Sequence, residues 1–293
     1  MSLHNHYNDT ADIWDIDITP SSSLFDLKLG ELWRYRDLVL LLVKRDFSAK
    51  YKQTVLGPLW HFIQPILTTF VSFLIFNVVA EIKTDGKNAV LFQMSGIIIW
   101  NYFASCLTST STTFTSNAAI FGKVYFPRLV MPVSVILSNL VQLGIQSLLL
   151  CATMLFFFLA KGVVIPLGVN WLLLPLVVVI MAGIGLGLGI IISSLTTKYR
   201  DFQVLITFGV QLLMFGSAVN YPLQTLQAKA GSFIYGLVKW NPISTLVESF
   251  RNILLGGEVP YAMLAYTVGF MLASLLFGAM LFNKVEKTFM DTV

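Results

Sequence analysis

Hydrophobic residues along this chain gather into six long stretches that are separated by short polar segments. A helix needs about 20 apolar residues to cross the hydrocarbon core of a bilayer. None of the six stretches contains Lys, Arg, Asp or Glu, and a charge at the centre of a membrane costs about 2.5–3.5 kcal/mol. We therefore predict an all-α integral membrane protein with six transmembrane helices, at about Leu56–Ala80, Ala89–Ser111, Val133–Ala160, Trp171–Leu195, Phe202–Val219 and Tyr261–Phe282.

Composition and charge agree with this prediction and add an orientation. The chain is 56% hydrophobic and 12% charged, with a mean hydropathy of +0.77. Of its 19 basic residues, thirteen fall in the N-terminal segment, two alternate connections and the tail. Basic residues concentrate on the cytoplasmic side, so both termini are predicted to be cytoplasmic. The same asymmetry explains the net charge of +4 without nucleic acid as a partner.

Three regions divide the chain. Residues 1–27 are polar and acidic, and we expect a mobile N-terminus there. Residues 28–55 are predicted to contain an amphipathic helix in the cytoplasmic interface, either as a membrane anchor or as a platform for a partner. Residues 56–293 form the transmembrane domain. The apolar stripe of the interface helix consists of Leu29, Leu32, Trp33, Val39, Leu40, Val43 and Phe47.

The connection between the second and third spans is short, cytoplasmic and half apolar. Large apolar side chains in such a loop need a binding surface, either lipid headgroups or a groove in a partner protein. We favour the partner. The side chains concerned are Ile120, Phe121, Tyr125 and Phe126.

The last external connection, residues 220–260, contains a helix with clear boundaries. Asn241 is a suitable N-cap, Pro242 suits the first helical position, and Gly256 can end the helix. Its apolar residues occupy one arc, and Glu248 and Arg251 fall outside that arc. With the apolar patch around Phe233 to Val238, this predicts a re-entrant or interfacial pair of helices at the outer face.

Catalytic and cofactor signals are nearly absent from the sequence. The pairs Gly86-Lys87 and Gly122-Lys123 are followed by neither Ser nor Thr, so neither is a phosphate-binding loop. We expect no ATPase site, no cofactor and no metal site in this chain. Because the spans place no ionisable residue at mid-membrane, a proton relay or an ion-coupled carrier is also disfavoured.

Three spans carry residues in a regular pattern: polar side chains in the third, glycines in the fourth and aromatic rings in the first. In the third span Asn139, Gln142, Gln146 and Thr153 share a 60° stripe, which suits sugar hydroxyls but equally suits helix–helix contacts. In the fourth span, alternate glycines from Gly183 to Gly189 predict close helix packing. The first span places aromatic rings on one 120° face, for stacking on sugars or for contact with lipid: Phe62, Phe70, Phe73 and Phe76.

Several motifs resemble one known family. They are Leu32-Trp-Arg-Tyr-Arg-Asp-Leu, Lys44-Arg-Asp-Phe, Tyr51-Lys-Gln-Thr-Val-Leu-Gly-Pro-Leu-Trp60, Phe126-Pro127, Tyr199-Arg200-Asp201, and Trp240-Asn241-Pro242 followed by Glu248 and Arg251. Together they resemble the ABC-2 type permeases that export lipid-linked polysaccharides such as O-antigen, teichoic acid and capsule. The resemblance covers nearly the whole chain after residue 27.

The resemblance implies a homodimer that binds two separate ABC ATPase subunits in the bacterial inner membrane. It also implies short external gate helices between the fifth and sixth spans, and a polyprenyl-pyrophosphate-linked glycan as cargo. The first-span aromatics and the third-span amides Asn139, Gln142 and Gln146 would line the glycan channel. The residues that would couple to the ATPase are Arg45, Asp46, Asn117, Ile120, Phe121, Lys123, Tyr125, Phe126, Arg200 and Asp201.

Two other functions remain open at this point. The cargo could be a drug or a simple lipid, although the polar and aromatic stripes favour a sugar. The chain could instead be a membrane enzyme of glycan assembly, but it lacks the buried or paired carboxylates that such chemistry uses. A gene for an ATPase beside the gene for this chain would favour export.

Overall fold

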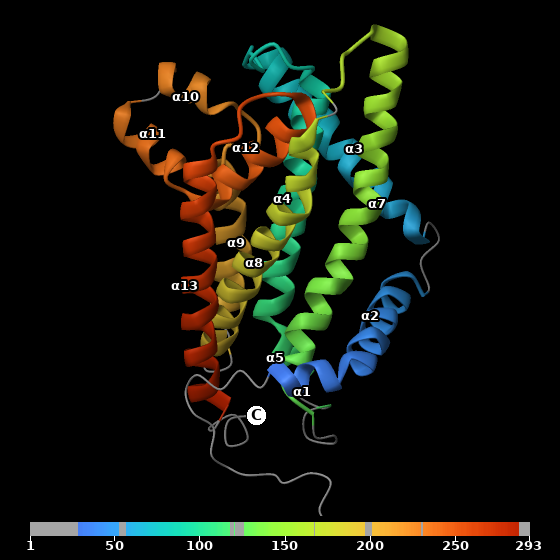
Figure 1. The fold of residues 1–293 in the computed structure, drawn as a ribbon, viewed down its shortest axis with the longest axis vertical. Helices are drawn as coiled ribbons and strands as arrows, with labels where there is room; N and C mark the ends of the chain where they lie inside the picture. Colours follow the sequence, from blue (N-terminus) through green and yellow to red (C-terminus); the bar gives the residue numbers. More distant parts are fainter. Residues whose placement is uncertain are drawn as a thin grey trace, which may run out of the picture.

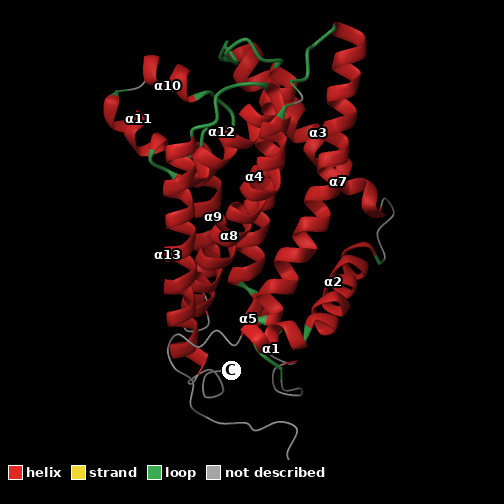
Figure 2. Cartoon of the chain, in the orientation of Figure 1, coloured by secondary structure: helices red, strands yellow, loops and turns green. Residues whose placement is uncertain are grey.

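The computed structural model describes residues 29–52, 57–117, 120, 126–166, 168–196, 201–229 and 231–286. These ranges form helices joined by loops, and they contain no strand (Figures 1 and 2). The all-α prediction is therefore confirmed for the described part of the chain. The long helices run roughly side by side. α10 (Leu223–Lys229), α11 (Ser232–Lys239) and α12 (Pro242–Leu255) gather at one end, and α1 (Leu29–Arg34) lies at the other.

Within the described residues, five helices are long and apolar enough to cross a membrane, and each matches a predicted span. The first is α3 (Trp60–Ser72), which continues without a break as the π-helical segment η2 (Phe73–Val79). The fourth begins as η3 (Val169–Leu173) before α8. The main part of this fourth span is α8 (Leu174–Thr196). The remaining three spans are α4 (Ala89–Ser111), α7 (Val130–Lys161) and α13 (Tyr261–Glu286).

The fifth predicted span, Phe202–Val219, is shorter than expected. α9 begins at Phe202 as predicted but ends at Phe215, and its 14 residues extend only about 21 Å, less than the roughly 30 Å of a hydrocarbon core. Residues 216–220 continue as a buried turn. Hydropathy could not reveal this end because the sequence stays apolar to Val219.

α4 is the centre of the bundle. It contacts α3, α7, α8, α9 and α12, and 78% of its apolar segment is buried, compared with 11% for the first span. The main apolar core lies along α4, α7, α8 and α12. The first span and α9 therefore stand at the edge of the bundle and leave most of their apolar surface uncovered.

The alternating glycines of α8 pack against two different helices. A Cβ atom on Gly185 or Gly189 would lie 2.8 or 2.5 Å from side chains of α4, and one on Gly183 or Gly187 would collide with α13. Two faces of α8 thus approach their neighbours closely, as small residues allow. This confirms the packing role predicted for Gly183–Gly189.

The N-terminal amphipathic segment is helical but broken. α1 ends at Arg34 and α2 (Arg36–Tyr51) begins after Tyr35. Val39 and Leu42 are buried, and α2 packs against α7. The predicted stripe is divided, because Val39 is buried within the chain whereas Trp33 and Leu40 are 72% and 62% exposed. The break at Tyr35 and the contact with α7 select a different buried face.

Candidate functional site

Three parts of the structure bear on transport: the end that carries α1 and α2, the bundle interior, and the end that carries α10 to α12. At the first end, Phe126 is buried and Ile120 packs against the same cluster. Phe121, Lys123, Tyr125 and Arg200 lie outside the described residues. The cluster joins α2, α5 (Thr113–Ser116), α7, α8 and α13 through Val39, Leu42, Phe114, Phe126, Val130, Met131, Ile190 and Phe282.

This cluster ties the loop to the membrane helices. Phe114 stacks on Phe282 with ring centroids 5.2 Å apart, so α5 is fixed to the end of α13. Asn117 caps α5 by donating from Nδ2 to Thr113 O at 2.9 Å. A displacement of the 117–126 connection would therefore act on several spanning helices at once, because their side chains share one packed core.

The remaining residues expected at this end lie apart from that cluster. Arg45 and Asp46 form an ion pair on α2, with Nη2 and Oδ1 2.8 Å apart. The guanidinium of Arg45 is 39% exposed and remains reachable from outside. Asp201 lies at the start of α9 and is exposed. The structure thus places these residues on separate helices, and it does not bring them into one site.

In the bundle interior, the polar stripe on α7 is largely covered by the same chain. Asn139 and Gln146 are each 2% exposed, and Asn139 Nδ2 lies 4.0 Å from Cys106 Sγ on α4. Gln142 is half-buried. The two buried amides therefore contact neighbouring helices, whereas Gln142 is reachable from outside the chain.

The first-span aromatics lie on the uncovered edge of the bundle. Phe70 is 57% exposed, and Phe62, Phe73 and Phe76 are half-buried. Large apolar surface on a membrane helix faces lipid, a second protein copy or a lumen. Their predicted role in the glycan channel is compatible with this placement.

At the other end, α12 is bounded as predicted. Asn241 is the N-cap and accepts a hydrogen bond from Ile243 N at 3.0 Å, Pro242 occupies the first turn, and Gly256 follows the last helical residue with φ at +82°. These caps show why the Asn-Pro pair marks the start of a helix here.

Arg251 is a residue whose position the sequence analysis missed. It was expected outside the buried arc of α12, but it is 2% exposed. Its Cζ lies 3.6 Å from the centroid of the Phe92 ring, and Nε donates to Phe92 O at 3.3 Å. Gly96 makes room for it, since a Cβ there would collide with the guanidinium. Arg251 therefore fixes α12 to the first turns of α4.

Side chains of α4 and α12 also hold the turn that ends α9. Backbone carbonyls inside a membrane must find hydrogen-bond donors. A helix that stops at Phe215 leaves carbonyls in the turn that follows, and three side chains supply the donors. The bonds are Asn241 Nδ2 to Gly216 O (2.8 Å), Arg251 Nη1 to Ala218 O (3.3 Å), Arg251 Nη2 to Val219 O (2.6 Å) and Gln93 Nε2 to Asn220 O (3.0 Å).

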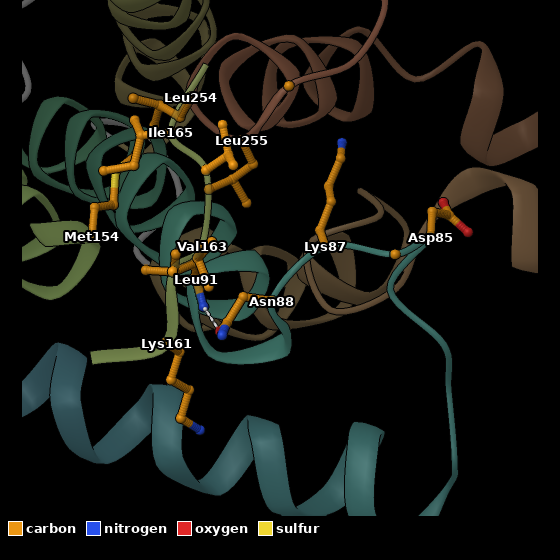
Figure 3. A pocket seen from close by; sticks show the side chains of 14 residues that line it. Asp85, Lys87, Asn88, Leu91, Met154, Lys161, Val163, Ile165, Leu254 and Leu255 are labelled. Carbon is orange, nitrogen blue, oxygen red and sulfur yellow. Dashed lines mark hydrogen bonds between the residues drawn. The ribbon is translucent and has the colours of Figure 1, made fainter. Parts of the chain in front are cut away.

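A pocket of about 630 Å³ opens beside α12 at this end. Its lining comes from the start of α4, the end of α7 with the following loop, and the end of α12, around an apolar floor that includes Leu91 and Met154. Figure 3 shows Lys87 and Lys161 extending from its wall in different directions. Lys87 donates instead to Asn252 Oδ1. The two lysines therefore do not form a clamp for an anion.

Burial perturbs the charged groups around Lys87. Burial, followed by the Arg251 charge, lowers the pKa of Lys87. Burial also raises the pKa of Glu248, an effect that Arg251 and Lys87 oppose. Glu248 therefore favours its neutral form more than an exposed carboxyl does.

Glu248→Gln is expected to gain stability over the native chain as pH rises. A raised carboxyl pKa contributes stability that is complete below the unfolded value near 4.5 and is lost as pH rises through the folded pKa. Glutamine does not titrate, so the advantage of the variant should grow as pH rises from about 4.5 through the raised pKa of Glu248. Thermal unfolding of both proteins in detergent across this range measures it. A constant or shrinking difference would contradict the burial of Glu248.

The five apolar helices define a multi-pass integral membrane protein. The described residues hold no group of three or more His, Cys, Asp or Glu side chains placed to bind a metal ion. Comparison with known proteins then gives the family. Residues 37–255 match the family model for the ABC-2 type transporter, and this is most of the chain. The chain belongs to the ABC-2 type transporter family.

Relatives resemble the chain over most of its length. It is 27% identical to the O-antigen export system permease protein RfbA of Klebsiella pneumoniae, over 87% of this chain and 94% of the relative. A protein of the same name from Myxococcus xanthus is 29% identical over 79% and 85%. The polysialic acid transport protein KpsM of Escherichia coli is 22% identical over 86% and 94%.

Proposed function

We propose that this chain is the permease subunit of an ABC exporter that moves a lipid-linked, O-antigen-like polysaccharide across the bacterial inner membrane. The observation that carries this proposal is the similarity to export permeases for O-antigen and polysialic acid over most of their own length. The charge-free apolar helices support a membrane path without an ion-coupled step. The energy source is then a separate ATPase subunit.

In this proposal the chain crosses the membrane six times, with both termini in the cytoplasm. α9 and the turn at residues 216–220 serve as the fifth crossing, and α11 and α12 are the external gate helices. Residues 1–27 form a polar N-terminus, residues 28–55 an interface helix, and residues 56–293 the transmembrane domain. The basic residues at the α1 end support this orientation.

The assembly that we propose contains two copies of this chain and two ATPase subunits. The 117–126 connection, Arg45, Asp46, Arg200 and Asp201 would contact the ATPase. The packed cluster around Phe126 would carry its motion into the spanning helices. The uncovered apolar surfaces of α3 and α9 are available for contact with a second copy. The glycan would pass Gln142 and the aromatic residues of α3, with Asn139 and Gln146 beside it.

Phe121→Ala and Tyr125→Ala are expected to weaken binding of the ATPase by about tenfold or more. Truncating an apolar anchor at a well-buried contact costs roughly 1–3 kcal/mol. The measurement is co-purification of the tagged chain with a candidate ABC ATPase from the same organism. Phe233→Ala is the matched control, because Phe233 is 76% exposed on α11 at the opposite end. Equal recovery of ATPase by all three variants and the native chain would place the loop against lipid instead.

A further inference from the structure

Part of the uncovered surface of α4 is polar, unlike that of α3 and α7. Most of α4 is buried, but one half-buried stripe along the helix and its C-cap consists of Asn101, Ser105, Thr108, Ser109 and Thr112. The exposed positions on α3 and α7 are mostly Leu, Ile, Val and Phe. Surfaces that face lipid are predominantly apolar, so this stripe is a candidate for contact with water or with a polar ligand.

α9 carries a second polar stripe opposite the first. Gln203, Thr207 and Gln211 recur every four residues and therefore share one side of the helix. All three are exposed, and α9 has no buried residue. α4 and α9 contact each other, so the two stripes are neighbours.

A pocket of about 260 Å³ lies between these stripes at the end of the bundle near α5. Every described residue of its lining is uncharged, and all but one are polar: Thr108, Ser109, Ser111, Thr112, Gln203, Ile206 and Thr207. Pockets for drug-sized ligands have volumes of roughly 300–1,000 Å³. This pocket therefore suits one sugar ring rather than a whole oligosaccharide.

Packing against α8 does not account for these hydroxyl groups. The packing side of α4 faces the glycines of α8, where Cys106 and Thr110 lie against Gly185 and Gly189. Thr108 and Thr112 project from roughly the opposite side of α4, because residues two apart differ by about 200° around a helix. The side of α4 that faces away from α8 therefore carries polar side chains that do not serve the contact between these two helices.

The hydrogen-bonding capacity of the pocket matches sugar hydroxyls. Thr108 Oγ1 donates to Ala104 O at 2.7 Å and Thr207 Oγ1 donates to Gln203 O at 3.1 Å, so their oxygen lone pairs remain available as acceptors. The Gln203 amide adds two donors and an acceptor. A neutral sugar ring presents both donors and acceptors, and the described lining residues supply partners for both.

We propose that this pocket between α4 and α9 binds one neutral sugar residue of the exported glycan at the cytoplasmic mouth of the path. This inference rests on the proposed function and adds to it a specific binding site. Gln203, Thr108 and Thr112 are the residues that bind the sugar. Bonds to hydroxyl groups are individually weak and easily exchanged with water, which suits a chain that must slide past the site.

The test is thiol labelling of a Ser109→Cys variant in a complex of the full chain with its ATPase. The native cysteines are first removed by Cys106→Ser and Cys151→Ser, so that the only thiol is the introduced one. The probe for binding is the lipid-linked glycan fraction extracted from the cells that carry this chain. A membrane-impermeant thiol reagent should react roughly tenfold faster at this position than at Leu148→Cys, because thiolate forms only where water enters. Leu148 is 68% exposed on the apolar side of α7 and is the matched control. The extracted glycan should slow the reaction about fivefold.

Loss of hydroxyl groups gives a second readout. Thr108→Val with Thr112→Val should raise the glycan concentration needed for half-protection about tenfold. Thr267→Val removes a similar hydroxyl that bonds Met263 O at 2.7 Å on α13, and it should change nothing. Labelling no faster than at Leu148→Cys, or labelling that the glycan does not slow, overturns the site. The proposed function is judged separately, by whether the native complex moves the glycan at all.

Discussion

Arg251→Met is expected to destabilise the protein by on the order of 3 kcal/mol, from the loss of hydrogen bonds that a charged group donates. Methionine fills similar volume against Phe92 but cannot donate to Ala218 O and Val219 O, so the turn after α9 loses its donors. The variant should show an apparent melting temperature in detergent lower by roughly 5 °C or more. We also expect it to lose export even where it inserts into the membrane.

Two further variants separate the role of the hydrogen bonds from that of charge. Arg251→Lys keeps the charge but lacks the planar fork, so it should recover only part of the stability. Gly96→Ala keeps Arg251 but adds a Cβ within 2.6 Å of Val219 O, and it should behave like Arg251→Met. Native stability in both Arg251→Met and Gly96→Ala would show that the turn does not depend on this guanidinium.

Gly187→Ala is expected to disturb the packing of α8 on α13. The added Cβ would lie 2.8 Å from Ser274 C and 2.9 Å from Leu275 N, which are backbone atoms that cannot rotate away. Overpacking of this kind typically costs about 1–3 kcal/mol. Gly269→Ala on α13 is the control, because nothing lies within 4 Å of its added Cβ. The two variants should differ clearly in thermal stability, and equal stability would mean that α8 and α13 separate without cost.

Local signals in the sequence were enough to predict the helices. Charge-free apolar runs located the five long spans, and the Asn241 cap with Gly256 bounded α12 to the residue. These features depend only on neighbours along the chain. The end of α9 at Phe215 does not, because its turn is held by donors from α4 and α12.

The candidate site was less predictable because burial depends on contacts between distant residues. The helical wheel placed Arg251 outside the apolar arc, yet carbonyls more than thirty residues away bring it inside. The helical wheel also grouped Asn139 with Gln142, although Asn139 is buried and only the Gln142 side chain is partly exposed at the surface of the chain. The stripe on α4 was present in the spacing of Asn101, Ser105 and Thr108. It could have been found if hydroxyl groups had been weighed together with amides.

Translocation in proteoliposomes tests the central claim most directly. The chain is reconstituted alone or with the ABC ATPase that co-purifies with it, and the extracted lipid-linked glycan is added on the ATPase side. We expect the chain alone to hydrolyse no ATP and to move no glycan. The complex should make the glycan inaccessible to an external lectin only when ATP is hydrolysed. ATP hydrolysis by the clean chain alone, or a complex that hydrolyses ATP without moving the glycan, would contradict the permease function.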